Sequence, residues 1–301
     1  MVGKGVGYGK VILFGEHFVV HGAPAIAAGI SNAAVVEVKT AKRNSIVTEQ
    51  KVVPELSLAA IQNVLSSMGV KECYEVMLEG DLHTFGGLGS SAAFCVALAR
   101  AVADERGIHP SEEEINGHAY NGEKAFHGNP SGIDNLMATY GGVMEFTRGA
   151  TSAENRFGMI ALKKPLDLAV SFTGKFGLTP KMIEAVAKFR DSDRDGFEQL
   201  KDEYLDIEEN GKKALMKGQT DVIGKLMNAN QTLLQELGVS DELNDEIVKR
   251  AMDYGALGSK LTGGGGGGCC ISLGKDKDHA KELSDRLSKA GFQSFSTRIG
   301  R

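Results

Sequence analysis

Short apolar and alternating segments in the first half of the chain predict strands with helices between them. Residues 11–14, 33–39 and 73–78 form short runs that are apolar or that alternate between apolar and polar side chains, as strands of a packed sheet do. Residues 91–106 are rich in alanine and almost uncharged until their end, which predicts a helix buried on most sides. Ser111, followed by three glutamates, is typical of the start of a further helix.

The second half of the chain has a longer helical pattern. Thr179 followed by Pro180 is typical of a helix N-terminus, where a hydroxyl caps the first turn and proline occupies its first position. From there to Tyr254 the sequence is charged and helix-like, with interruptions predicted near Gly218 and Gly238. This stretch therefore predicts several long helices in succession.

The end of the chain predicts a strand over residues 270–273, a helix over 279–290 and a closing strand over 292–298. Strands and helices that follow one another without regular β-α-β alternation indicate an α+β protein. A polar stretch with small residues near the middle divides the chain into two expected parts, residues 1–150 and 151–301.

Composition and charge exclude several classes of protein. The chain has 301 residues with a net charge of −5, so it lacks the basic surface that a nucleic acid partner needs. No apolar run approaches the roughly 20 residues of a membrane span. The four cysteines have neither the number of a disulfide framework nor the spacing of a zinc site. We therefore expect a cytoplasmic globular enzyme that binds neither nucleic acid nor membrane.

Glycine is the one unusual feature of the composition. The chain has 39 glycines among its 301 residues, or about 13%, against a usual share of about 7%. They gather in four clusters, over residues 3–9, 86–89, 128–142 and 263–268. Clusters between strongly patterned segments favour loops whose backbone approaches a ligand closely, whereas scattered glycines would indicate flexible chain.

The strongest candidate for chemistry is the second glycine cluster and the start of the helix that follows it. Its residues are Gly86, Gly87, Leu88, Gly89, Ser90, Ser91 and Ala92. The first amides of a helix bind phosphate, glycines let the preceding loop fold around the anion, and hydroxyls can reach a bound metal ion. A tight turn with a serine cap is the structural alternative. The segment is not a Walker loop, which requires a lysine followed by serine or threonine.

Two acidic residues and a lysine form a second candidate group. Glu123 ends a helix-like stretch and Asp134 lies in a turn-rich segment beyond it. One carboxylate of such a pair can hold magnesium while the other accepts a proton from an attacking hydroxyl. Lys10, at the edge of an apolar strand, would keep Asp134 ionised if the two meet. Otherwise Asp134 caps a turn and Lys10 is a surface cation.

Two further segments have both a structural and a functional interpretation. Glu16 and His17 form either a salt-bridged turn or part of a substrate site. The six glycines of residues 263–268 form either a flexible linker or a loop that closes a site. The second interpretation is favoured because a strand-like run, beginning at Cys269, follows them directly.

Taken together, these segments resemble the GHMP kinase family, which comprises galactokinases, homoserine kinases, mevalonate kinases and phosphomevalonate kinases. The resemblance covers essentially the whole chain and is strongest to the mevalonate kinase branch. It rests on the ordered segments GKVILFGEHFVVHG, GLGSSAA, GEKAFHGNPSGIDN, TYGG and GSKLTGGGGGGC.

The resemblance implies the two-lobed α+β fold of this family, with a ribosomal-protein-S5-like N-terminal part and a ferredoxin-like C-terminal part. It implies that residues 86–92 bind the phosphates of ATP and that Ser91 and Glu123 hold Mg²⁺. Asp134 matches the catalytic base of the family, and Lys10 matches the lysine that pairs with it.

The resemblance also implies a reaction and a substrate site. The expected reaction is ATP-dependent phosphorylation of the C5 hydroxyl of (R)-mevalonate to 5-phosphomevalonate, a step of isoprenoid biosynthesis. Glu16, His17 and Thr179 match substrate-contacting positions, beside Lys10 and Asp134. A homodimer is expected, as among relatives. Phosphomevalonate and sugar kinases share the glycine loop and remain alternatives, as does an inactive nucleotide-binding sensor.

Overall fold

The structure, a computed structural model, describes residues 1–84, 86–149, 154–177 and 179–300, and for Thr179 and Pro180 it describes the backbone only. The chain divides into two compact units, each assembled from separate stretches of sequence. The boundary expected between residues 150 and 151 lies outside the described residues and stays a prediction. In the part of the chain that the structure describes, no helix is long and apolar enough to cross a membrane.

The first unit, residues 1–10, 29–84 and 88–141, contains a sheet of mixed strand directions. Its strands are β1 (Val2–Phe14), β2 (Pro24–Ala41), β3 (Ser45–Val47) and β4 (Cys73–Gly80). Strand β2 pairs antiparallel with β4, and β3 runs parallel to β4. Strands β1 and β2 pair with each other and also extend into the second unit.

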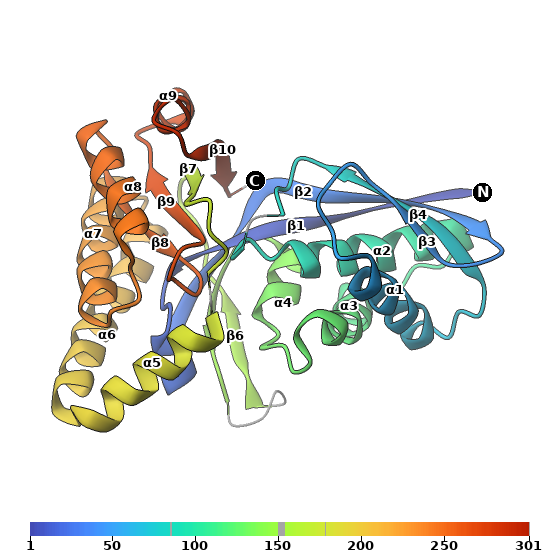
Figure 1. Ribbon diagram of the computed structural model, residues 1–301, viewed down its shortest axis with the longest axis horizontal. Helices are drawn as coiled ribbons and strands as arrows, with labels where there is room; N and C mark the ends of the chain where they lie inside the picture. Colours follow the sequence, from blue (N-terminus) through green and yellow to red (C-terminus); the bar gives the residue numbers. More distant parts are fainter. Residues whose placement is uncertain (85, 150–153, 178, 301) are drawn as a thin grey trace. The chain divides into compact units, whose positions relative to one another are not determined.

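Four helices complete the first unit and lie along one face of its strands (Figure 1). They are α1 (Pro54–Ser67), α2 (Ser90–Arg106), α3 (Glu112–His127) and α4 (Ile133–Tyr140). Helix α2 contacts α1, α3 and α4, so its alanine-rich sequence is buried on most sides, as predicted. Helix α3 begins with a capping box, in which Ser111 and Glu114 each accept a hydrogen bond from the backbone amide of the other.

The first glycine cluster belongs to strand β1, so the prediction of a ligand-binding loop over residues 3–9 is wrong. Gly3, Gly5 and Gly7 alternate along the strand on the side that faces α2. A Cβ atom on Gly5 would lie 2.1 Å from the carbonyl oxygen of Ala97, and the other two glycines meet α2 one turn away on either side. Two residues of a strand advance about 6.6 Å and four of a helix about 6 Å, so the two periods match.

The second unit contains residues 11–28, 86–87 and the described chain from residue 142 onward. Its strands are β5 (Val143–Thr147), β6 (Arg156–Met159), β7 (Leu166–Phe172), β8 (Gly258–Thr262), β9 (Cys269–Leu273) and β10 (Gln293–Ile299). The last four form an antiparallel sheet in the order β10-β7-β9-β8. Strands β7, β8 and β9 are buried along their whole length.

Helices of the second unit follow the charged stretch that the sequence predicts. They are α5 (Thr179–Ser192), α6 (Arg194–Lys217), α7 (Thr220–Glu236), α8 (Glu242–Asp253) and α9 (Lys277–Lys289). Gly218 ends α6 in the left-handed conformation, and Gly238 follows α7 with a positive φ, so both predicted interruptions are confirmed. The break at Asp193, whose carboxylate caps α6, was not predicted. The α+β class is confirmed.

We expect Gly5→Ala to destabilise the first unit by at least 1–3 kcal/mol, because its methyl group would overlap the carbonyl oxygen of Ala97 and force β1 and α2 apart. Urea unfolding of the purified protein measures this change in free energy.

Gly117→Ala is the matched control for this substitution. Gly117 lies inside α3 with open space where its Cβ atom would stand, so alanine should raise helix stability by about 0.5–1 kcal/mol. Equal effects of the two substitutions would contradict the proposed packing of β1 on α2.

Candidate active site

The second glycine cluster leads into a helix N-terminus that no side chain caps. Gly89 precedes α2 in the left-handed conformation, with φ of 68°, and the first turn contains no acidic residue. The amides of this turn are therefore available to an anion, and the helix dipole favours negative charge there. A Cβ atom on Gly89 would lie 3.0 Å from Cγ of Lys10 and 3.8 Å from Cβ of Asp134, so glycine permits this close approach.

Lys10 and Asp134 form an ion pair beside this helix N-terminus. Nζ of Lys10 lies 3.1 Å from Oδ1 of Asp134, and the lysine side chain is only 6% exposed. The backbone amide of Lys10 donates to the carbonyl oxygen of Leu88, which fixes β1 to the glycine loop. Asp134 lies in the first turn of α4, after Gly132 with φ of 89°, and remains 30% exposed. The predicted meeting of Lys10 and Asp134 is thus present, with the carboxylate accessible.

Ser91 and Glu123 lie together where α2 packs on α3. The carboxyl group of Glu123 interacts with the hydroxyl of Ser91, and the same hydroxyl lies 3.2 Å from Nε2 of His127. Gly122 makes this packing possible, because a Cβ atom there would lie 2.7 Å from the sulfur atom of Cys95. The two predicted metal ligands are therefore neighbours on adjacent helices.

Glu123 is buried in an unusual electrostatic environment. Burial first, and then the charge of Asp134, raise the pKa of Glu123 to about 8. Its Oε1 atom is buried and has no hydrogen-bond partner among the described residues. Such an oxygen, next to a serine hydroxyl, fits a hard divalent cation that takes its remaining ligands from phosphate or water. Within the described chain no cluster of three His, Cys, Asp or Glu side chains could hold a metal ion by itself.

The segment after β1 carries Glu16 and His17 in the second unit. His17 has a φ of 65°, and its Nε2 atom lies 2.9 Å from the carbonyl oxygen of Gly264. Because a carbonyl can only accept, Nε2 carries the proton. Burial lowers the pKa of His17, so the ring is neutral and its Nδ1 atom is an acceptor, without a partner among the described residues.

Lys260 is a residue whose importance the sequence did not reveal. It lies on β8, is fully buried, and forms an ion pair with Glu16 while donating to the carbonyl oxygen of Leu261. Burial lowers the pKa of Lys260, and the charge of Glu16 opposes that shift. A lysine inside an otherwise buried strand was the available signal, because such a residue needs a buried acidic partner.

The polyglycine segment, residues 263–268, is a loop fixed by hydrogen bonds, so the alternative of a flexible linker is rejected. Asn244 both donates to the carbonyl oxygen of Gly267 and accepts from its amide, at 3.0 Å each. The amide of Gly266 donates to Val239, and the amide of Gly268 donates to Lys175. Five of the six glycines have a positive φ, a conformation that other residues adopt only with strain.

The remaining predicted positions are placed as follows. Gly87 lies against Thr262 and Gly263, so the two glycine-rich loops meet in the second unit. Thr179 is the first residue of α5, and its side chain lies outside the described part of the structure, so its predicted substrate contact stays a prediction.

The stability of the ligand-free protein should fall as the pH rises from about 4.5 to about 8. Glu123 is protonated in the folded state throughout this window, whereas in the unfolded state it releases its proton near 4.5. Glu123→Gln, which is neutral at every pH, should remove a slope of up to about 1.4 kcal/mol per pH unit. Urea unfolding between pH 5 and 8 measures the slope.

Glu236→Gln, at an exposed position at the end of α7, is the control and should keep the slope of the unmodified protein. If Glu123→Gln and Glu236→Gln have the same pH dependence, the buried carboxyl group is not its source.

Lys260→Met should lower the free energy of unfolding by about 3–5 kcal/mol, because it leaves the carboxylate of Glu16 buried without its cation. The double variant Lys260→Met with Glu16→Gln should recover most of this loss, since no uncompensated charge remains. Chemical denaturation of the three proteins tests the interaction.

Lys281→Met is the matched control, because Lys281 forms an exposed ion pair with Asp285 one turn away on α9. It should cost less than about 1 kcal/mol. A similar loss of unfolding free energy from both lysine substitutions would show that the buried ion pair stabilises the protein no more than the exposed one does.

Comparison with known proteins gives the same interpretation as the site. The model of the GHMP kinase N-terminal domain matches residues 55–142, and that of the GHMP kinase C-terminal domain matches residues 212–293. The mevalonate kinases of Aeropyrum pernix and Pyrococcus furiosus are each 32% identical to the chain, over 97% of its length and 94% of theirs.

Solved structures extend this similarity to the whole fold. Mevalonate kinase of L. major, determined in complex with R-mevalonate, is 35% identical, with a TM-score of 0.92 over 99% of this chain and 95% of that one. Mevalonate kinase of Methanococcus jannaschii is 26% identical, with a TM-score of 0.82 over 100% of this chain and 98% of that one. The two-part α+β fold expected from the sequence is confirmed, and the chain belongs to the GHMP kinase family of ATP-dependent kinases.

Proposed function

We propose that this kinase transfers the γ-phosphoryl group of ATP to the C5 hydroxyl of (R)-mevalonate, giving 5-phosphomevalonate for isoprenoid biosynthesis. The observation that carries the chemistry is the ion pair of Lys10 and Asp134 beside the uncapped N-terminus of α2. The choice of mevalonate rests on the similarity to mevalonate kinases along nearly the whole chain.

The first turn of α2 supports a role in binding the phosphates of ATP. Its amides and the hydroxyls of Ser90 and Ser91 are donors, and the glycines before them leave room for the anion. Fixed donors of this kind offset the negative charge that spreads over the transferred phosphoryl group, and they need no reorganisation during the reaction.

Asp134 is proposed as the general base and Lys10 as its partner. The carboxylate accepts the proton of the C5 hydroxyl as that oxygen forms its bond to the γ-phosphorus and the bond to ADP breaks. Lys10 holds the Asp134 carboxylate in place through their ion pair and stabilises the negative charge that develops on the attacking oxygen. General-base catalysis of this kind contributes on the order of 10²–10⁴-fold to a rate.

Ser91 and Glu123 fit a magnesium ion, because the ion would supply a partner for the buried, unpaired Oε1 atom and would compensate the charge that burial disfavours. Bound Mg²⁺ supplies positive charge next to the phosphates of ATP. We also propose, from the family resemblance, that the enzyme is a homodimer and works in the cytoplasm.

His17 is proposed to contact a hydroxyl of mevalonate. Its neutral ring has Nδ1 as an acceptor, which suits a hydroxyl donor and would repel a carboxylate. The substrate contact of Glu16 also remains a proposal, and its buried pairing with Lys260 supports a role in holding the segment on which His17 lies.

The test is ADP release with Mg-ATP and four separate acceptors: mevalonate, phosphomevalonate, galactose and homoserine. We expect turnover with mevalonate alone and a product phosphorylated at the C5 oxygen, identified by phosphorus NMR. Turnover with another acceptor would keep the kinase mechanism and overturn the substrate. Bound ATP without turnover on any acceptor would favour a nucleotide sensor.

Asp134→Asn tests the base in the same assay. The amide keeps the shape of the side chain and loses its basicity, so kcat should fall about 10²–10⁴-fold while ATP still binds. Near-normal turnover in this variant would remove Asp134 from the proposed role, whatever the acceptor.

A further inference from the structure

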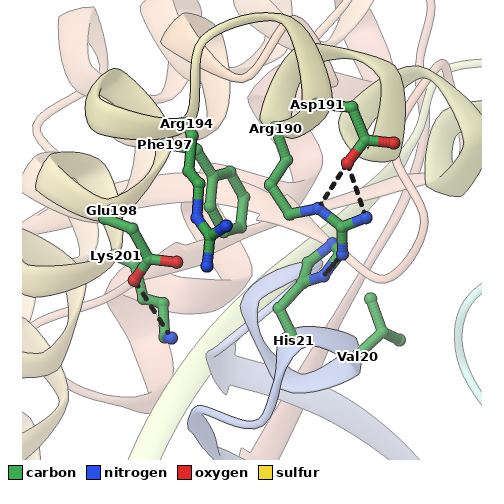
Figure 2. A pocket seen from close by; sticks show the side chains of 8 residues that line it. All are labelled: Val20, His21, Arg190, Asp191, Arg194, Phe197, Glu198 and Lys201. Atoms are coloured by element: carbon green, nitrogen blue, oxygen red, sulfur yellow. Dashed lines mark hydrogen bonds and ion pairs between the residues drawn. The ribbon is translucent and has the colours of Figure 1, made fainter.

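A polar pocket lies in the second unit, where α5 ends and α6 begins (Figure 2). It has a volume of about 620 Å³. Arg194, Phe197 and Lys201 line it from α6, three and four residues apart, so they share one face of that helix. The short 3₁₀ turn Phe18–His21 and the last turn of α5 complete the wall.

The charges of this pocket are unevenly paired. Arg190 binds Asp191 through Nε and Nη2, and Lys201 is 3.4 Å from Glu198. The guanidinium group of Arg194 has no ion pair or hydrogen bond with any described residue, and Figure 2 shows no dashed line from it. Three cations therefore face two carboxylates in a chain whose net charge is −5.

Both carboxylates are exposed, which makes their ion pairs easy to exchange. The side chain of Asp191 is 68% exposed and that of Glu198 is 48% exposed. Exposed pairs of this kind contribute little to stability. An anion that enters the pocket can therefore take over Arg190 and Lys201 at small cost.

His21 lines the same pocket and contacts Arg190. Nη1 of Arg190 lies 3.3 Å from Nδ1 of His21, and a guanidinium can only donate, so Nδ1 accepts. Burial, and then the charges of Arg190 and Lys201, lower the pKa of His21, so the ring is neutral and carries its proton on Nε2. This N–H is buried and has no partner among the described residues.

None of the residues that line the pocket is among the proposed catalytic or substrate-binding residues. Arg190 follows Thr179, the start of α5, by eleven residues, and a helix of that length spans about 16 Å. No residue of the pocket belongs to the glycine loop or to the group around Asp134.

We propose that this pocket is a binding site for the phosphate group of a small molecule. Arg194 supplies a planar set of donors that matches phosphate oxygens, and Lys201 supplies a compact positive charge on the same helix face. The unprotonated oxygens of a phosphate group accept hydrogen bonds, and both of these side chains only donate them. The binding is independent of catalysis and of the identity of the acceptor substrate.

The experiment is a titration of the full-length protein with inorganic phosphate, followed by NMR of isotopically labelled histidine rings. His21→Gln identifies the signals of His21, which report on this pocket and not on the ATP site. We expect saturable shifts with a millimolar dissociation constant, and Arg194→Gln should weaken binding at least tenfold. Unmoved His21 signals, or unchanged affinity in Arg194→Gln, would overturn the proposal.

Three controls define the result. Arg250→Gln, at an exposed ion pair on α8, should bind phosphate as the unmodified protein does. Chloride at matched ionic strength should not shift the signals, and equal shifts would show charge screening instead of binding. Acetate should bind more weakly than phosphate, and equal affinity would overturn the assignment to a phosphate group. Thermal unfolding of each variant shows whether it is folded.

Discussion

The direct contact between the backbone of β1 and helix α2 is the constraint on which the candidate active site depends. Three alternating glycines leave the strand without side chains at this contact, so the strand and the helix are held at a fixed, short distance. Strand β1 then places Lys10 at the start of α2, where Gly89 leaves room for the side chains of Lys10 and Asp134. One packing contact therefore positions both the open helix amides and the ion pair beside them.

The two carboxyl groups of this region differ because their surroundings differ. Asp134 has the ammonium group of Lys10 next to it and is accessible, which suits a group that exchanges a proton with a substrate. Glu123 is buried, and its pKa is raised to about 8. The fold thus gives one carboxylate an internal cation as its partner and leaves the other in need of an external one. This division follows from burial and pairing, since the chemical groups are the same.

Much of the fold and of the site could be predicted from local patterns. The capping box at Ser111 and the glycine before α2 depend only on residues a few positions apart, so the local sequence is enough to predict both helix starts. The glycines of β1 were misinterpreted because the reason for them is a helix about 90 residues away in the chain. The partnership of Glu16 and Lys260 joins residues 244 positions apart, and sequence reasoning gave no register for that pairing.

The pinning of the polyglycine segment fixes its length as well as its composition. Asn244 holds both polar groups of Gly267, while Gly266 is tied to Val239, so each glycine has its own place. A glycine added to this segment, or removed from it, would leave the loop composed of glycine alone. It would nevertheless move the amides of one end out of register with their partners. The number of glycines in this segment is therefore constrained, as well as their identity.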